Sequence, residues 1–358
     1  MTDHPTLDEL DQRITNALQL NGRASWRQIA TALDAPESTV ARRGQALLAE
    51  HVVTVTGVLD HLRCGLGISV HMRFRTRPGR VEAVAEAVAA LPTSRFVNVT
   101  TGSFDVAAEL VVPSHRHLPQ VLAEIAHLDD VQESESMLAI RKFAAFEEWN
   151  PGNLDSRAVD TLRSVATVTD YPHRDWLKPE QLSDLEFEIA RVLAADGRTT
   201  YATVAARVGV SEATAARKVE SMVRRGCLRF RTIFDSSAVG LGVELYQWLT
   251  VDPIHLEAAG ERLAKLPSTR YLSAATGRFN LVLEGALPGY GDLYHYASRI
   301  VGDLPGVVSH DLTLQVRTLK RAWIHIGPDG RARERSGPEW TRRDIISPTA
   351  GTPRRKGD

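Results

Sequence analysis

Residues 91–105 read LPTSRFVNVTTGSFD, and residues 266–280 read LPSTRYLSAATGRFN, 175 positions further along the chain. Leu, Pro, Arg, Thr, Gly and Phe are identical at aligned positions, and most other changes are mild, such as Tyr for Phe and Asn for Asp. The same offset continues without a gap upstream, where residues 10–33 align with residues 185–208. Self-similarity at a fixed offset indicates an internal repeat. The chain therefore contains one structural unit twice.

The composition is typical of a soluble globular protein with several domains. Of the 358 residues, 43% are hydrophobic and 24% are charged, which suits roughly two to four ordinary domains. We find no leader pattern and no run of about 18 apolar residues, so we expect neither secretion nor membrane spanning. The two cysteines, Cys64 and Cys227, have no metal-type spacing, and we expect both to be small buried residues in a reducing cytoplasm. With a net charge of −1, binding to a polyanion requires a local basic surface.

Each copy begins with three short predicted helices and a strand. In the first helix apolar residues recur at i, i+4, i+7 and i+8, the spacing of an amphipathic helix. An Asn-Gly or Asp-Gly pair then suits a turn, and two further helices follow, which is typical of a helix-turn-helix. A stretch rich in β-branched and aromatic residues predicts the strand. These segments begin at Leu10, Trp26, Pro36 and His51 in copy one and at Leu185, Tyr201, Ser211 and Gly226 in copy two.

The rest of each copy predicts the order β-α-β-β-α-β of a ferredoxin-like domain. One face of such an antiparallel sheet has no helices, so it favours pairing with a second sheet. The predicted fold class is therefore α+β, with two winged helix-turn-helix units each followed by a βαββαβ domain. Besides the two strands joined by the TGSF or TGRF turn, the segments are about 68–75, 81–90, 118–128 and 131–143 in copy one, and 245–251, 256–266, 290–304 and 307–320 in copy two.

The predicted domain boundaries follow from this alignment of the two copies. The predicted units are a first winged helix-turn-helix at 1–60, a first βαββαβ domain at 64–147, a linker at 148–180, a second winged helix-turn-helix at 181–235, a second βαββαβ domain at 239–326, and a basic tail at 327–358. We expect the Arg-rich tail to be disordered. It could add nonspecific contacts to phosphate.

A winged helix-turn-helix followed by a βαββαβ domain with a T/S-G-x-F-D turn resembles the Lrp/AsnC (feast/famine) family of transcriptional regulators. The motifs are LDELDQRI, LQLNGRAS, IATALDAPESTVARR and TGSFD in copy one, and LSDLEFEI, LAADGRTT, VAARVGVSEATAARK and TGRFN in copy two. The resemblance excludes residues 148–180 and the tail after Gly327. It implies sequence-specific binding to double-stranded DNA, dimers formed by sheet-on-sheet contact, often higher oligomers, and in many members an amino-acid effector.

Most family members carry one copy per chain. A tandem chain can therefore build within itself the pair that two subunits usually make, with residues 150–178 as the tether. Fully extended at about 3.3 Å per residue, this tether exceeds roughly 90 Å, so its reach does not limit the arrangement.

The third helix of each copy carries the candidate DNA contacts. Arginine on its polar face can donate two hydrogen bonds to guanine or one to phosphate, and short hydroxyls suit phosphate or base edges. As an alternative, Arg43 and Lys218 pair with carboxylates of the first helix. The candidate residues are Ser38, Thr39, Arg42, Arg43, Thr214, Arg217 and Lys218.

The two copies differ in charge and in helix signals. Residues 7–56 hold five arginines and six acidic residues, whereas residues 182–231 hold nine basic and six acidic residues. Since phosphate neutralisation dominates affinity, we expect the second unit to bind DNA more tightly. Copy one has Pro36 at its cap position and Gly44 inside the third helix, where glycine weakens a helix by about 1 kcal/mol. Whether copy one reads bases is left open by the sequence.

The TGSF and TGRF turns have a structural and a functional interpretation. The glycines permit a tight turn, and Phe104 and Phe279 fill the core. The resemblance implies that the turns line an effector cleft, in which Asp105 would meet the ammonium group of an amino acid. Asn280 lacks that charge, so copy one is the favoured pocket. The candidate effector residues are Thr101, Gly102, Ser103, Asp105, Thr276, Gly277 and Asn280.

The sequence predicts no metal, no cofactor and no catalytic residue. The His115-Arg116-His117 run has no cysteine or carboxylate cluster nearby, and no phosphate loop or nucleophile elbow occurs. The rival function is a siroheme-decarboxylase-like enzyme, because that family shares this fold and includes fused two-copy chains. It typically has a histidine on the strand after the turn, where this chain has SFDVAAELVV and RFNLVLEGAL, with Glu109 and Glu284. A non-enzymatic regulator is therefore the main prediction.

A third alternative is an interaction protein whose helical units no longer contact DNA. The nearly neutral charge of copy one favours it, and the basic residues Arg217, Lys218, Arg224 and Arg225 oppose it.

Overall fold

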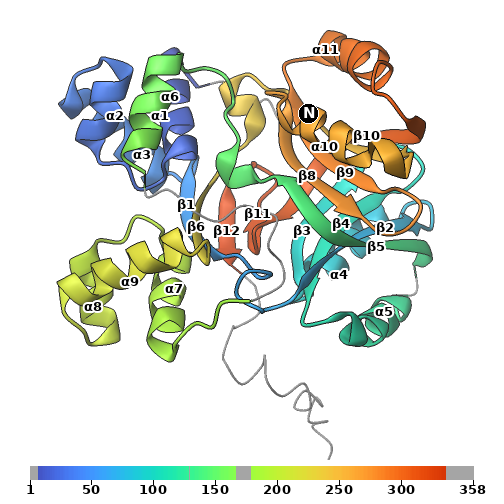
Figure 1. Ribbon diagram of the computed structural model, residues 1–358, viewed down its shortest axis with the longest axis horizontal. Coiled ribbons are helices and arrows are strands. Elements are labelled where there is room, and N and C mark those ends of the chain that lie inside the picture. The colour runs from blue at the N-terminus through green and yellow to red at the C-terminus, as the bar shows by residue number, and fades with distance from the viewer. Residues whose placement is uncertain (1–6, 129, 167–178, 336–358) are drawn as a thin grey trace, which may run out of the picture.

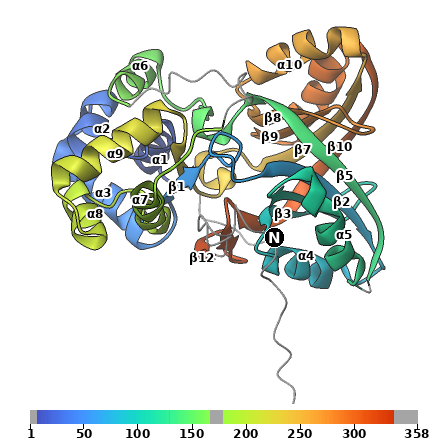
Figure 2. The ribbon, with the colours of Figure 1, turned by 60° about the horizontal axis from the view of Figure 1, so that its bottom comes forward.

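Two groups of helices lie on one side of the molecule, and a large sheet with its own helices lies on the other (Figures 1 and 2). The computed structural model describes residues 7–128, 130–166 and 179–335. Each group of helices is one of the two predicted helix-turn-helix units. The units consist of α1 (Glu9–Leu20), α2 (Trp26–Leu33) and α3 (Glu37–Ala49), and of α7 (Asp184–Ala195), α8 (Tyr201–Val208) and α9 (Glu212–Arg224).

Side-chain caps define where most of these helices begin. Ser25 and Ser183 each form a capping box, with Gln28 and Glu186 respectively, so two otherwise unpaired backbone donors are satisfied at each helix start. The helix α9 is capped by Ser211, whose hydroxyl accepts from the backbone N–H of Thr214. Pro36 offers α3 no side-chain hydrogen bond, so the recognition helix of copy one starts without this cap.

A two-stranded ribbon joins the two helix-turn-helix units. Strand β1 (Thr54–Leu59) follows the first unit and pairs antiparallel with β6 (Leu228–Ile233), which follows the second. The register runs from Thr54 opposite Ile233 to Leu59 opposite Leu228. The strand predicted to leave each helical unit therefore pairs with its counterpart from the other copy, which places the two units side by side.

The predicted β-α-β-β-α-β order is present in both copies. The elements of copy one are β2 (Ile68–Thr76), α4 (Val81–Ala90), β3 (Ser94–Thr100), β4 (Val106–Val112), α5 (Leu118–Ala126) and β5 (Val131–Ala144). Those of copy two are β7 (Val243–Val251), α10 (Leu256–Ala264), β8 (Thr269–Ala275), β9 (Leu281–Leu287), α11 (Tyr290–His295), continued by a π-helical turn (Tyr296–Val301), and β10 (Val307–Arg321).

The two sheets face each other and also pair along their edges. The sequence analysis did not predict the pairing along the edges. Strand β5 pairs with β2 through residues 131–138 and then with β8 through residues 139–144. Strand β10 likewise pairs first with β7 and then with β3. Both strands are long, with 14 and 15 residues against 7 to 9 in their partners. The order β10-β3-β4-β2-β5-β8-β9-β7, returning to β10, closes the sheet into a ring within one chain.

Side chains alternate between the two faces of this ring, as the period of a strand requires. In β2, Val70, Met72 and Phe74 belong to the apolar core beneath α4 and α5. Their neighbours His71 and Arg73 bond to Ser273 and Asp311 of the other copy. The inner face of the ring is therefore rich in polar and charged groups, and the outer face carries the apolar cores.

Two segments differ from the sequence predictions. Inside the predicted linker lies α6 (Ser156–Ser164), capped by Asp155, and its buried Val159 and Leu162 belong to the core of the first helix-turn-helix unit. Residues 167–178 of that linker lie outside the described residues.

The strand β11 (Ile324–Ile326), at the end of the predicted second βαββαβ domain, forms a hairpin with β12 (Ala332–Arg335), which lies in the predicted tail, and this hairpin extends from β10. Ile324 and Ala332 pack there with Val58 and Ile233 of the ribbon, which explains why residues 327–335 are structured. Residues 336–358 lie outside the described residues. Among the helices that the structure describes, none is long and apolar enough to cross a membrane.

Candidate nucleic-acid interface and ligand-binding turns

Arg42 and Arg217 occupy equivalent exposed positions on α3 and α9. Neither forms an ion pair with any residue that the structure describes, so both guanidinium groups are available to a partner. Ser38 is exposed and Thr39 is half-buried. Thr214 is half-buried as well, and its hydroxyl lies 2.9 Å from that of the capping Ser211.

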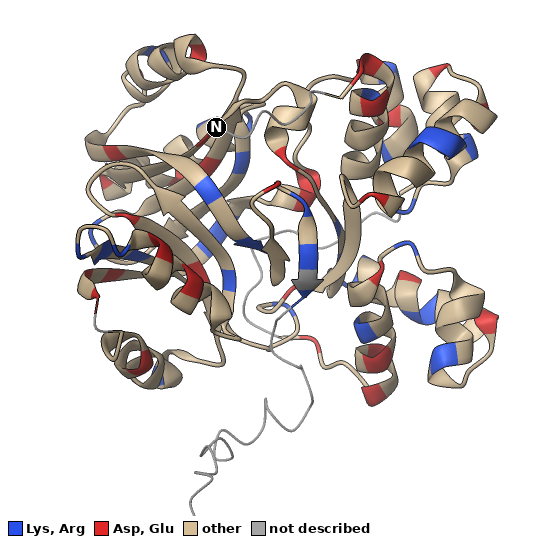
Figure 3. Cartoon of the chain, turned by 180° about the vertical axis from the view of Figure 1, so that it is seen from behind, with Lys and Arg blue, Asp and Glu red and all other residues tan. Residues whose placement is uncertain are grey.

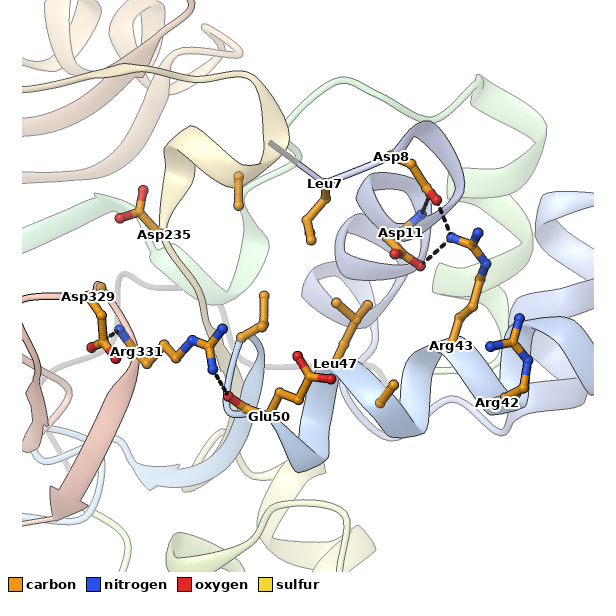
Figure 4. A pocket seen from close by; sticks show the side chains of 14 residues that line it. Leu7, Asp8, Asp11, Arg42, Arg43, Leu47, Glu50, Asp235, Asp329 and Arg331 are labelled. Carbon is orange, nitrogen blue, oxygen red and sulfur yellow. Dashed lines mark hydrogen bonds and ion pairs between the residues drawn. The ribbon is translucent and has the colours of Figure 1, made fainter. Parts of the chain in front are cut away.

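Their neighbours Arg43 and Lys218 are held by carboxylates of the first helix of each unit. Arg43 lies between Asp8 and Asp11, with N–O distances of 2.5 and 2.9 Å (Figure 4). Lys218 lies 3.5 Å from Glu186, which also accepts a hydrogen bond of 2.6 Å from Arg225. These contacts fit the alternative that both residues hold their own unit together.

Gly44 has a packing role inside α3. A Cβ atom at this position would overlap the ring of Trp26 on α2. In copy two the equivalent positions hold a smaller ring, Tyr201, and a larger aliphatic residue, Val219, in one apolar core. The glycine therefore allows the close approach of a bulky indole ring, at the expense of helix propensity.

Two equivalent arginines, Arg23 and Arg198, each reach across to the opposite helix-turn-helix unit. Arg23 donates to the carbonyl of Gly197 at 2.6 Å, and Arg198 donates to that of Gly22 at 2.7 Å. Arg23 also lies over the Tyr201 ring, 4.8 Å from its centroid, and Arg198 lies over the ring of Trp26 at 4.4 Å. Burial, with a smaller contribution from Arg23, lowers the pKa of Arg198 to about 10.

The sequence analysis missed these reciprocal contacts. Their only signal is the arginine that follows Asn-Gly in copy one and Asp-Gly in copy two. Together with the ribbon, they fix the spacing of the two units. Lysine and arginine occur on both units, interspersed with acidic residues (Figure 3).

Each of the TGSF and TGRF turns contacts the last strand of the other copy. The backbone N–H of Thr101 donates to the carbonyl of Leu314 at 3.0 Å, and its hydroxyl accepts from the N–H of Leu314 at 3.0 Å. Thr276 makes the same two contacts with Leu138, both at 2.9 Å. Gly102, with a φ of 98°, allows the close approach to Thr313, where a Cβ would lie 2.7 Å from Cγ2. Gly277, at the equivalent position, has a φ of 93°.

Asp105 and Asn280 have a structural partner on the neighbouring strand. Asp105 accepts hydrogen bonds of 2.7 Å from the backbone N–H and 3.2 Å from the hydroxyl of Thr76. Asn280 bonds the N–H and the carbonyl of Val251, at 2.8 and 2.7 Å. An amide satisfies this position as well as a carboxylate does, which explains why the two copies differ here.

Arg73 lies beside the turns and inside the ring, and the sequence analysis did not single it out. Its guanidinium is 2.8 Å from Glu135 and 2.8 Å from Asp311, one acidic residue from each copy. It is enclosed by the rings of Phe104, Trp248 and Phe279, at 4.2, 4.9 and 4.8 Å from their centroids. Ser103, exposed on the turn, donates to Asp311 at 2.5 Å, so it connects the turn to this buried charge.

The equivalent glutamates Glu109 and Glu284 have different surroundings inside the ring. Glu109 pairs with Arg95 at 3.1 Å and accepts from Ser69 at 2.5 Å. Arg270, the counterpart of Arg95, pairs instead with Glu244 at 2.6 Å. Glu284 forms no ion pair with the residues that the structure describes, and burial raises its pKa to about 7.

A cleft of about 380 Å³ opens beside α3, between the first helix-turn-helix unit and the β11–β12 hairpin (Figure 4). Arg42 and Arg43 line one side of it. On the other side Arg331 donates to the carbonyl of Glu50 at 3.1 Å. The hairpin that follows β10 therefore contacts the end of the recognition helix.

Three stretches of the chain match models of known families. Residues 7–48 match the AsnC-type helix-turn-helix domain, residues 69–147 the Lrp/AsnC ligand binding domain, and residues 182–229 a winged helix-turn-helix DNA-binding domain. An uncharacterized HTH-type transcriptional regulator of Pyrococcus furiosus is 30% identical over 134 residues, which are 37% of this chain and 90% of that protein. A similar regulator of Pyrococcus abyssi is 28% identical over 37% of this chain and 85% of its own length.

Among solved structures, the siroheme decarboxylase NirDL has a similar fold, with a TM-score of 0.57 over 90% of this chain and 96% of that chain. The sequence identity is 16%, so this likeness concerns the fold alone. The domain matches and the relatives together identify the class of protein. The chain belongs to the Lrp/AsnC family of helix-turn-helix transcriptional regulators, and it carries two helix-turn-helix domains in a tandem two-copy form.

Proposed function

We propose that this chain binds specific DNA sequences through α3 and α9 together and regulates transcription in the cytoplasm. The observation that carries the proposal is a pair of exposed guanidinium groups at equivalent positions of two recognition helices. Arg42 and Arg217 form no ion pair within 7–128, 130–166 and 179–335. The ribbon and the reciprocal contacts of Arg23 and Arg198 hold these helices in a fixed pair. Two such helices suit successive major grooves of one duplex.

Within this interface we assign base reading to Arg42 and Arg217, with Ser38, Thr39 and Thr214 close to phosphate or base edges. Arg43 and Lys218 act at the margin, since carboxylates already hold them. The second unit provides the larger share of affinity because of its more basic composition.

We further propose that the TGSF and TGRF turns bind an amino acid or a related small metabolite. Both turns contact the last strand of the opposite copy, so a ligand there would touch both halves of the ring. Copy one remains the favoured pocket, because Asp105 carries a charge that Asn280 lacks. The ammonium group of a ligand would compete with Thr76 for this carboxylate. Calorimetric titration of amino acids into the protein and into Asp105→Asn tests the assignment, because the variant keeps the hydrogen bonds of the turn and loses the charge.

Association of several chains is part of the proposal, although the sheet-on-sheet contact expected between chains is made here between the two copies of one chain. The second βαββαβ domain exposes Tyr290 and Tyr294 one turn apart on α11, together with Val308 on β10. Such apolar surface favours contact with another copy. Sedimentation analysis of the full chain would measure the number of copies.

The test of DNA binding is a gel-shift titration with the promoters of the chain's own and neighbouring operons, repeated at rising salt. A regulator should bind one fragment preferentially and lose affinity steeply with salt, since each phosphate contact releases counterions. The double variant Arg42→Ala/Arg217→Ala should abolish the preference and keep the fold. Absence of any preferred fragment would reject the proposal.

A siroheme-decarboxylase-like activity is the second candidate, and the fold likeness over most of both chains is the observation that favours it. The strand positions in question hold Glu109 and Glu284, and Glu109 is committed to Arg95. We therefore propose that the chain is not this enzyme. An ultraviolet-visible titration with siroheme would decide, because a bound tetrapyrrole shifts its absorption and turnover changes its mass.

A further inference from the structure

The two cysteines of the chain meet in the folded protein, although 163 positions separate them. Cys64 lies in the loop between β1 and β2, and Cys227 lies directly before β6, after the turn that follows α9. The Sγ atom of Cys64 is 3.6 Å from the backbone carbonyl oxygen of Cys227. Both thiols are free, and they share one apolar core with Leu66 and Met222.

Backbone hydrogen bonds hold the two segments against each other. The N–H of Asp60 donates to the carbonyl of Cys227 at 2.9 Å, and the N–H of Cys64 donates to the carbonyl of Asp60 at 2.9 Å. The side chain of Arg63 donates to the carbonyl of Arg225 at 2.9 Å. The meeting of the thiols is therefore fixed by the fold and does not depend on a mobile surface loop.

The surroundings make the thiols chemically unequal. A hydrogen bond with Cys64 lowers the pKa of Cys227, and the positive charge of Arg225 acts in the same direction against burial. The same hydrogen bond, with burial, raises the pKa of Cys64. A thiolate therefore forms first on Cys227, and the thiolate is the nucleophilic form of cysteine.

We propose that Cys64 and Cys227 are a redox modification site that forms a reversible intrachain disulfide with hydrogen peroxide as the oxidant. The Cys227 thiolate attacks peroxide, so an S–O bond forms, the O–O bond breaks, and hydroxide leaves and is protonated to water. Cys64, after losing its proton, attacks the sulfur of the sulfenic acid, forming the S–S bond and releasing the second water. The two thiols lose two electrons and two protons, and peroxide is reduced to two waters.

Size restricts the oxidant. Cys227 is fully buried and Cys64 is 8% exposed, so only a small reagent reaches the pair. Peroxide should therefore oxidise it much faster than glutathione disulfide does, a contrast that an exposed pair of cysteines would not show.

The disulfide would act on the second recognition helix, a consequence that rests on the proposed function. The backbone N–H of Cys227 bonds to the carbonyl of Met222 in α9 at 2.9 Å. An S–S bond of about 2.05 Å is much shorter than a thiol hydrogen bond, so its formation must shift the turn at 225–227 relative to the loop at 60–66. Because Arg217 lies on the same helix, oxidation should weaken DNA binding, by roughly tenfold if its base contact is lost.

The experiment treats the full, reduced chain with peroxide and then alkylates it under denaturing conditions. We expect the intact mass to fall by about 2 Da and both thiols to escape alkylation, with full recovery after dithiothreitol. Peptide mapping should join the peptides of Cys64 and Cys227. In Cys64→Ala the mass should not fall, and Cys227 should gain oxygen instead. Alkylation of both thiols after peroxide treatment of the wild-type chain would overturn the proposal, whatever the variants do.

DNA binding is then compared between the reduced and oxidised wild-type chain, with Cys64→Ala/Cys227→Ala as the control. Weaker binding only of the oxidised wild-type chain supports the regulatory consequence, and unchanged binding by a fully cross-linked chain overturns it. Lack of binding in the reduced state would reject the proposed function and leave the thiol chemistry to be judged from the masses alone.

Discussion

Neighbouring basic residues on the recognition helices have different surroundings. The reason is that adjacent positions in the sequence lie on different sides of a helix. Arg42 and Arg217 are exposed, whereas Arg43 and Lys218 form ion pairs with carboxylates of the first helix. The sequence predicted the polar face of α3 and α9 but kept both roles open for these pairs. Only the placement of the first helix distinguishes a residue that is free to bind from one that is held.

We expect Arg217→Ala to weaken binding to a specific DNA fragment more than Arg42→Ala, because the second unit is the more basic. Loss of a bidentate contact to guanine corresponds to about 1–3 kcal/mol. Dissociation constants from fluorescence anisotropy at constant salt measure the order. Equal losses in the two variants would reject it. Arg43→Ala is the matched control: it should lower the thermal stability of the first unit and change the sequence preference little.

Glu284 makes the stability of the protein depend on pH. Burial, the main cause, and Glu109 raise its pKa from 4.5 to about 7, and Arg270 acts in the opposite direction. Between these values the native state keeps a proton that the unfolded chain releases. The contribution of the neutral Glu284 carboxyl to the free energy of unfolding is thus fully present below pH 4.5. It is lost as the pH rises to about 7.

Glu284→Gln should therefore stabilise the protein at pH 8, by up to about 3 kcal/mol, and leave it nearly unchanged at pH 4.5. Urea unfolding at the two pH values measures the difference. Glu109→Gln should instead destabilise the protein at pH 8, since Arg95 would lose its buried partner. A gain of the same size from both substitutions would contradict the assignment.

At the scale of the element, the first unit has a larger side chain on α2 and a smaller one on α3 than the second unit has on α8 and α9. Trp26 fills the space that Gly44 leaves, while Tyr201 and Val219 hold the equivalent positions in one apolar core of copy two. The sequence indicated only that Gly44 lowers helix propensity. The compensating indole could not be predicted, because it comes from another helix.

Gly44→Val should destabilise the first unit by about 2 kcal/mol or more, because the new side chain overlaps the ring of Trp26. The double variant Gly44→Val/Trp26→Tyr should recover most of this loss, since it rebuilds the pair found in copy two. Thermal unfolding of both variants and of Trp26→Tyr alone completes a double-mutant cycle. Additive effects of the two substitutions would contradict the packing argument.

Periodicity and caps predicted the helix-turn-helix units and the βαββαβ order, because both are local properties of the sequence. The same reasoning missed α6, whose nine residues lie in a polar segment and bury only one side against the first unit. It also missed the partners of β5 and β10. Their length suggested long strands, but pairing with two successive neighbours is decided by the whole sheet. Arg73 could not be predicted either, because the groups that enclose it come from both copies and are brought together only by the whole sheet.

At the scale of the whole molecule, the two copies are joined by more than the segment between them. The closed ring, the β1–β6 ribbon and the contacts of Arg23 and Arg198 each pair copy one with copy two. The peptide connection through residues 167–178 is thus only one of several links.

A protease site inserted between Ala166 and Pro179 tests this arrangement. After cleavage we expect the two fragments to elute as one species in size-exclusion chromatography and to keep their DNA affinity within about twofold, since the noncovalent contacts remain. Adding Arg23→Ala and Arg198→Ala should lower the urea concentration at which the fragments separate. Separation of the cleaved wild-type fragments in native buffer would show that the ring does not hold without the connection.

Fusion of the two copies also changes what kind of site the protein can read. A regulator made of two identical subunits presents the same helix twice, and its target is accordingly palindromic. Here α3 exposes Ser38 and Arg42, whereas α9 exposes Ala213 and Arg217 at the matching positions. Substitutions in one recognition helix can change its preferred half-site without changing the half-site of the other helix. A genome search restricted to inverted repeats would overlook such targets, and a search for two unlike half-sites at one-turn spacing would find them.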